Sequence, residues 1–153
     1  MKKLITFLLA FVLTLSLCSC GEEAPGIGDT ATVEDVEIKF IGVETVTEPA
    51  LAPAEGNIYI LCEFEIYNHT GKELGISCAL SFQAYCDDRK CNFSLSALMS
   101  KGDHAQLDGT LGNNKKLQGV VGYEVPADWK ELEIVYTPDV VGDKNVTFVA
   151  KND

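Results

Sequence analysis

A ten-residue stretch with alternating side-chain character constrains the fold of this chain more than any other feature. In residues 58–67 (IYILCEFEIY), every second side chain from Ile58 to Ile66 is apolar, whereas Glu63 and Glu65 mark the opposite face. A repeat of two residues is the period of a β-strand with one buried face. We therefore predict a long, half-buried strand here.

Shorter segments of the same kind follow one another along the rest of the chain. We predict further strands at residues 36–40, 80–86, 91–95, 117–125, 131–136 and 145–150, with loops or turns at 47–57, 68–71, 87–90, 111–116 and 126–130. Residues 96–105 are ambiguous and could hold a helical turn. Short strands separated by turns, with no long helical period, predict an all-β fold, an antiparallel β-sandwich.

The N-terminus has the features of a signal peptide. Lys2 and Lys3 precede an apolar run from Leu4 to Leu17. As a helix this run would be only about 21 Å long, which is too short for a hydrocarbon core of about 30 Å. We expect residues 1–19 to be a removable signal rather than part of the fold.

The end of this signal resembles the bacterial lipobox. Leu17, Ser19 and Cys20 stand in the order Leu, tolerated residue, small residue, Cys, whereas Cys18 would have the bulky Leu17 directly before it. The resemblance selects Cys20 for lipidation, and two acyl chains would provide on the order of 20 kcal/mol of membrane attachment. The alternatives are an uncleaved anchor and a secreted protein without lipid.

The remaining chain is expected to form one domain on a tether, held at the outer face of the bacterial cell membrane. Residues 20–28 (CGEEAPGIG) are small, acidic and rich in Pro and Gly, which predicts a flexible tether. Residues 29–153 are expected to form the domain. Loss of the two signal lysines lowers the net charge from −11 to −13, and Arg89 is the single arginine. This negative charge excludes nucleic-acid binding. It would also repel the domain from an anionic membrane surface. Solubility alone is otherwise a sufficient explanation of the charge.

Cysteines provide the next candidate sites. Four follow Cys20, and outside the cytoplasm an even number suggests disulfides, for which three pairings exist; they are Cys62, Cys78, Cys86 and Cys91. If residues 88–89 are the centre of a tight hairpin, Cys86 faces Cys91 at a distance compatible with a disulfide. Free thiols are the alternative. Cys62 and Cys78 could form a second disulfide across the 68–71 turn or be buried thiols.

No catalytic or cofactor motif is found in the sequence, so we expect neither an enzyme nor a bound cofactor. A zinc site is not expected, since Cys86 and Cys91 are the only closely spaced pair. His69 and His104 are isolated and are expected to be exposed. The adjacent acids at 87–88 could hold a cation, but solvation is the simpler expectation. Trp129 is expected to pack at an end of the sandwich.

Three segments together resemble a known family. They are GDTATVEDVEIKFIGVE, YILCEFEIYNHTGKEL and LDGTLGNNKKLQGVVGYEVPADWKELEIVYTP. They are similar to the telokin-like, immunoglobulin-like domain of unknown function found in Gram-positive bacterial lipoproteins, over about residues 29–150. The resemblance implies an immunoglobulin-like sandwich in the cell envelope and supplies no catalytic residues. The four cysteines are not a hallmark of that family.

These features predict a binding or adaptor module anchored in the membrane by lipid. Loops on a rigid sandwich commonly carry function, so the candidate surfaces are residues 47–57, 87–90 and 96–116. Pairing of an edge strand with a partner is a second route. The partner could be an envelope protein, a wall polymer or a small ligand. The alternative is a structural or stress-related envelope protein without a specific ligand.

Overall fold

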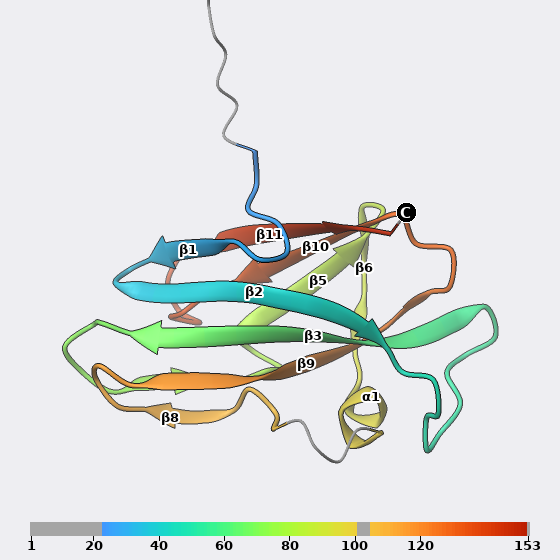
Figure 1. The fold of residues 1–153 in the computed structure, drawn as a ribbon, viewed down its shortest axis with the longest axis horizontal. Coiled ribbons are helices and arrows are strands. Elements are labelled where there is room, and N and C mark those ends of the chain that lie inside the picture. The colour runs from blue at the N-terminus through green and yellow to red at the C-terminus, as the bar shows by residue number, and fades with distance from the viewer. Residues whose placement is uncertain (1–22, 101–104, 153) are drawn as a thin grey trace, which may run out of the picture.

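The predicted strands form the layers of an all-β sandwich. The computed structural model describes residues 23–100 and 105–152. Its larger sheet has five strands in the order β1-β2-β3-β9-β7, and all its neighbours are antiparallel (Figure 1). These strands are β1 (Thr30–Val33), β2 (Val36–Thr45), β3 (Asn57–Asn68), β9 (Lys116–Pro126) and β7 (Asn92–Phe93).

A second sheet of four strands packs against the first in the order β11-β10-β5-β6. Its strands are β11 (Val146–Lys151), β10 (Glu131–Tyr136), β5 (Phe82–Cys86) and β6 (Arg89–Lys90). A small sheet pairs β4 (Leu74–Ile76) with β8 (Gly109–Leu111), and one short helix, α1 (Leu95–Met99), follows β7. The expected antiparallel sandwich is confirmed. No helix among the described residues has the length and apolar character needed to cross a membrane, and the predicted signal peptide and Cys20 lie outside those residues.

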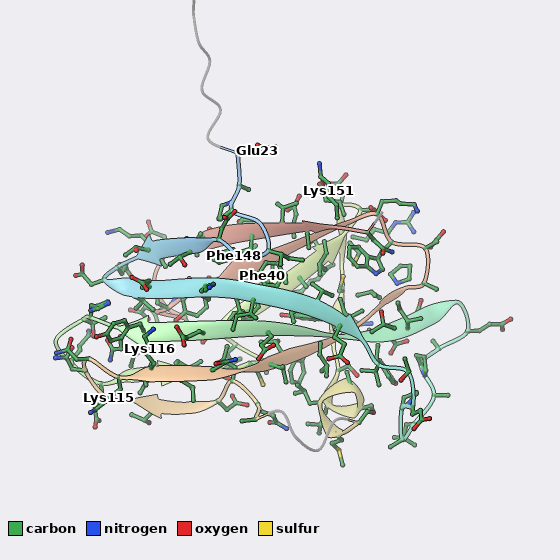
Figure 2. The ribbon with its side chains drawn as sticks, viewed as in Figure 1. Glu23, Phe40, Lys115, Lys116, Phe148 and Lys151 are labelled. Atoms are coloured by element: carbon green, nitrogen blue, oxygen red, sulfur yellow. The ribbon has the colours of Figure 1, made fainter. Side chains whose placement is uncertain are left out.

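Aromatic side chains from both sheets fill the space between them. Phe40 of β2 stacks on Phe64 of β3 with 4.7 Å between ring centroids, and Phe148 of β11 meets both rings edge-on. Figure 2 shows Phe40 and Phe148 close together where β2 passes β11. Each such pair adds about 0.5–1.5 kcal/mol beyond the burial of apolar area. The apolar face predicted for β3 is therefore the centre of the core.

Strand β9 is buried on both faces, which the sequence does not reveal. Leu61 of β3 and Gly122 of β9 lie opposite each other on the face that points away from the second sheet. Leu61 is nevertheless almost fully buried, because α1 packs across β9 and β3 on that side. Leu117, near the start of β9, is only half-buried. Helix α1 thus packs on the outer face of β9.

The hairpin between β5 and β6 has a different register from the predicted one. Asp87 and Asp88 form the turn, with φ of 47° and 65°, and Cys86 pairs with Arg89. The prediction that residues 88–89 form the centre and that Cys86 faces Cys91 is wrong. A two-residue turn of this type needs positive φ at both central positions, and aspartate adopts that conformation more readily than arginine.

The 68–71 turn does not connect paired strands, since β3 pairs with β2 and β9 while β4 pairs with β8. The hairpin across which Cys62 and Cys78 could have met is therefore not formed.

The N-terminal segment lies against both sheets before the first strand begins. The Pro25 carbonyl accepts a hydrogen bond from Val149 N at 2.9 Å, and Gly28 N donates to the Phe40 carbonyl at 2.7 Å. Residues 25–28 were predicted to belong to a flexible tether, but these bonds hold them to β11 and β2. Any free tether therefore ends before Pro25.

Candidate functional site

Two of the three loops expected to bind a partner meet beside α1. The loop at residues 46–56 is held at its far end by Glu124 of β9, whose carboxylate accepts hydrogen bonds from Asn57 Nδ2 and Ala54 N, both at 2.9 Å. These bonds, led by that from Asn57, lower the pKa of Glu124. At the near end of the loop, Val46 N donates to the Tyr59 carbonyl at 2.9 Å. The loop is thus fixed at both ends.

Helix α1 is short but well anchored. Ser94 caps its first turn, with its Oγ accepting a hydrogen bond from Ala97 N at 3.1 Å, an arrangement that typically stabilises a helix by about 1 kcal/mol. Ala97 and Leu98 are buried against β9. Leu95 and Met99, four residues apart, therefore share the outward face, where they are 54% and 70% exposed.

A hydrogen bond brings the 46–56 loop to this helix. Ala50 N donates to Ser100 Oγ at 3.3 Å, directly after the helix, and the adjacent Leu51 is 66% exposed. Leu51, Leu95 and Met99 are called the α1 surface below. Residues 91–100 contain no charged side chain, although 23% of the chain is charged. The α1 surface is therefore a set of exposed apolar side chains, and Glu44 and Glu48 line a hollow beside it together with Ser100.

The third predicted loop, at residues 87–90, is hydrogen-bonded to the turn between β9 and β10. Asp87 accepts hydrogen bonds from Glu131 N at 2.9 Å and from Lys130 N at 3.2 Å. Its carboxylate is thus already used by backbone donors, which leaves a structural role rather than the exposed cation site considered above. In Figure 1 this hairpin lies at the edge of the molecule opposite α1.

A cleft at the other end of the sandwich was missed by the sequence reasoning. It has a volume of about 650 Å³, which lies within the range of small-molecule sites. It is lined by Glu34, Asp35, Val36, Thr70, Lys72, Glu73, Leu74, Gly75, Pro138, Asp139, Val140 and Val141. Val141 is 96% exposed at its rim, and Lys144 lies 3.8 Å from Glu34. One feature of the sequence could have pointed to this cleft: two adjacent valines, Val140 and Val141, lie in the otherwise polar, turn-rich segment 137–145.

Comparison with known proteins places the chain in a family. Residues 25–146 match the domain of unknown function named DUF4352. The chain belongs to the DUF4352 family. No curated protein matches it.

Solved structures resemble the DUF4352 domain in fold. The candidate lipoprotein ycdA of Bacillus subtilis is 20% identical with a TM-score of 0.67, over 80% of this chain and 38% of that one. The yjhA protein of the same organism is 18% identical with a TM-score of 0.66, over 84% and 99% of the two chains. An uncharacterized β-sandwich protein of Clostridium difficile is 15% identical with a TM-score of 0.53, over 84% and 95%. At these identities the likeness extends to the fold alone.

The DUF4352 domain buries all four of its cysteines as free thiols. A hydrogen bond between the Cys86 and Cys91 thiols raises the pKa of Cys86 and lowers that of Cys91. Burial raises the pKa of Cys62, which lies close enough to Cys91 to interact electrostatically. Because Cys91 lies two residues beyond Arg89, the partner of Cys86, the two thiols meet diagonally across the hairpin. A Cys86–Cys91 disulfide stays a prediction.

The hydrogen bonds of Cys78 are made with Asp108 and not with Cys62. Its backbone N and its Sγ donate to the two carboxylate oxygens of Asp108, each at 2.9 Å. Burial, followed by this bond, raises the pKa of Cys78 to about 12. The thiol therefore stays protonated and serves to connect two loops. A Cys62–Cys78 disulfide also stays a prediction.

The remaining sequence candidates do not assemble into a reactive site within the described residues. The His69 ring packs on that of Tyr67 with 3.9 Å between centroids. Trp129 is buried, as expected, beside the turn between β9 and β10. His104 lies outside the described residues. Across residues 23–100 and 105–152, no group of three or more His, Cys, Asp or Glu side chains is placed to hold a metal ion.

Proposed function

We propose that this chain is a lipid-anchored binding module of the cell envelope that holds a protein partner on its α1 surface. The observation that carries the proposal is the exposure of Leu51, Leu95 and Met99, the last two within a segment, residues 91–100, that has no charged side chain. Exposed apolar patches mark interaction sites. Interface centres are depleted of charge and enriched in methionine.

The way this surface is supported favours binding over incidental exposure. The 46–56 loop is fixed by Glu124, and α1 by Ser94 and by its contact with β9. A partner would therefore meet side chains that are already held in place, so that little ordering entropy opposes association. A passive envelope protein without a ligand would have no need of such a surface.

The location outside the cytoplasm rests on the N-terminal sequence and on structural neighbours. Residues 17–20 resemble a lipobox ending at Cys20. The neighbours include the candidate lipoprotein ycdA and MPT63, a secreted protein of Mycobacterium tuberculosis that is 11% identical with a TM-score of 0.55 and is matched over 86% of this chain. The telokin-like, immunoglobulin-like resemblance of residues 29–150 supports the same location.

The test replaces the α1 surface and compares it with the end cleft. In the native host, the full chain would be cross-linked on intact cells, and its partners identified by mass spectrometry. We expect Met99→Glu and Leu95→Glu to remove a reproducible partner, because a buried carboxylate without a partner is costly at an interface. Val141→Glu, at a still more exposed valine of the end cleft, is the control and should leave the partner in place.

Each result separates the alternatives. Loss of the partner with Val141→Glu alone would move the binding site to the end cleft. A set of neighbours that no variant changes would favour the structural or stress-related role without a specific ligand. Anchoring is read separately, since Cys20→Ala should release the protein into the medium, and its retention in the membrane would contradict the lipobox interpretation.

A further inference from the structure

The N-terminal segment leaves the domain at one particular edge of the sandwich. The bonds of Pro25 to Val149 and of Gly28 to Phe40 fix the chain beside β11 and β2 from residue 25 onward. In Figure 1 the described chain enters next to β1 and β11, and Figure 2 shows Glu23 and Lys151 on that same side. Glu23 and Lys151 also line one shared hollow. The attachment point is therefore the β1–β11 edge.

The chain between the proposed lipid and this edge is short. Five residue steps separate Cys20 from Pro25. A fully extended chain covers at most about 3.3–3.6 Å per residue, so this segment spans no more than about 18 Å. The tether therefore allows the β1–β11 edge much less freedom than a linker of residues 20–28 would have given.

The α1 surface lies at the opposite edge of the same sheet. The strand order β1-β2-β3-β9-β7 places two strands between β1 and β9, on which α1 packs. At about 4.8 Å between neighbouring strands, β9 lies roughly 14 Å from β1 and β7 roughly 19 Å. Figure 1 shows α1 on the side of the molecule away from the entering chain.

We infer that the β1–β11 edge faces the lipid headgroups and that the α1 surface points away from the bilayer. This orientation rests on the proposed lipidation of Cys20. Ile27, 51% exposed beside the attachment point, is the exposed large hydrophobic side chain nearest to the anchor in sequence among the described residues. The domain thus lies close to the membrane rather than far from it, and its partner approaches from the outer side.

The charges at this edge argue against its insertion into the bilayer. Glu23, Asp29 and Glu131 line the hollow there together with Lys151. Three acids against one base are repelled by anionic lipids. The orientation is therefore imposed by the short tether and not by attraction of the edge to lipid.

The experiment measures the height of two labelled positions above the membrane. The full, lipidated chain would be reconstituted into vesicles of phosphatidylcholine and phosphatidylglycerol containing a headgroup-labelled acceptor lipid. A fluorescent donor would be introduced by a bioorthogonal amino acid at Lys151 in one variant and at Met99 in another. We expect energy transfer to be several-fold more efficient from position 151 than from position 99. Equal or reversed efficiencies would overturn the orientation.

A longer tether provides the control. Inserting twenty Gly and Ser residues after Gly21 adds a segment with a typical end-to-end distance of about 25 Å. Both efficiencies should then fall and become similar while the protein stays on the vesicles. A difference that persists would show that the domain itself binds lipid and would overturn the tether argument. Absence of the wild-type chain from the vesicles would instead contradict the lipid anchor, on which this inference depends.

Discussion

Replacement of Gly122 by alanine tests how α1 is held on the sandwich. A Cβ atom at residue 122 would lie 2.8 Å from the Ser94 carbonyl oxygen and 3.0 Å from both Ala97 Cβ and Leu98 Cγ. Non-bonded carbon atoms normally pack at about 3.5–4.0 Å. Gly122 does not have a positive φ, so its backbone conformation would accept alanine. The added methyl group therefore acts through its clash with α1.

The size of the effect follows from two opposing terms. Overpacking costs about 1–3 kcal/mol, whereas a glycine-to-alanine change without a clash stabilises by about 0.4–1 kcal/mol. Gly75 of β4 is the matched control, because a Cβ there would meet nothing within 4 Å. We expect Gly122→Ala to lower the free energy of unfolding by the difference of the two terms, about 1 kcal/mol and at most about 2.6 kcal/mol, and Gly75→Ala to leave it unchanged or raise it slightly.

The assay is urea denaturation in the Cys20→Ala background, combined with hydrogen exchange of residues 95–99. Exchange in α1 should increase in Gly122→Ala even where the sheets remain intact. Equal stability of the two alanine variants, with unchanged exchange in α1, would refute the view that the helix rests directly on the backbone of β9.

Three further changes probe the core, the loop and the thiols. Tyr136→Phe should leave the free energy of unfolding unchanged or raise it, because the buried hydroxyl has no hydrogen-bond partner within the described residues; a loss above about 1 kcal/mol in urea denaturation would contradict this. Hydrogen bonds lower the pKa of Glu124, so its stabilisation of the 46–56 loop should be complete above the ordinary value of 4.5 and decline as the pH falls below it. Hydrogen exchange of the loop should show that decline, and Glu124→Gln should remove the pH dependence. Cys86 and Cys91 are free thiols in the structure but interact with each other, so oxidation outside the cytoplasm should join them. Alkylation of the denatured, unreduced protein recovered from the host should then find both blocked as a disulfide, and four reactive thiols would contradict that pairing.

Strands with alternating side chains could be predicted because one face is buried and most of the other is solvated. The alternation in residues 58–67 and 131–136 has a direct physical cause, since these side chains alternate between the core and water. The strands β4 and β8 have three residues each, which is too short for a period to be recognised. Leu61 shows the other limit, since its burial depends on α1, a helix far away in sequence.

The candidate site was predictable only in part. Residues 47–57 and 96–116 were expected to bind because they are loops at the ends of strands, but the bond between Ala50 and Ser100 that joins them depends on the tertiary fold. The end cleft combines the segments 34–36, 70–75 and 138–141, whose meeting no local pattern predicts. The hairpin register depended on which residues accept positive φ, a preference that favours Asp87 over Arg89.

Photo-cross-linking from the α1 surface tests the central claim most directly. A photoreactive amino acid would replace Met99 in one variant and Val141 in another, both in the full chain on intact cells of the native host. The binding-module account predicts one abundant, reproducible adduct from position 99 and none of the same mass from position 141. The same adduct from both positions, or a strong adduct from position 141 alone, would contradict it.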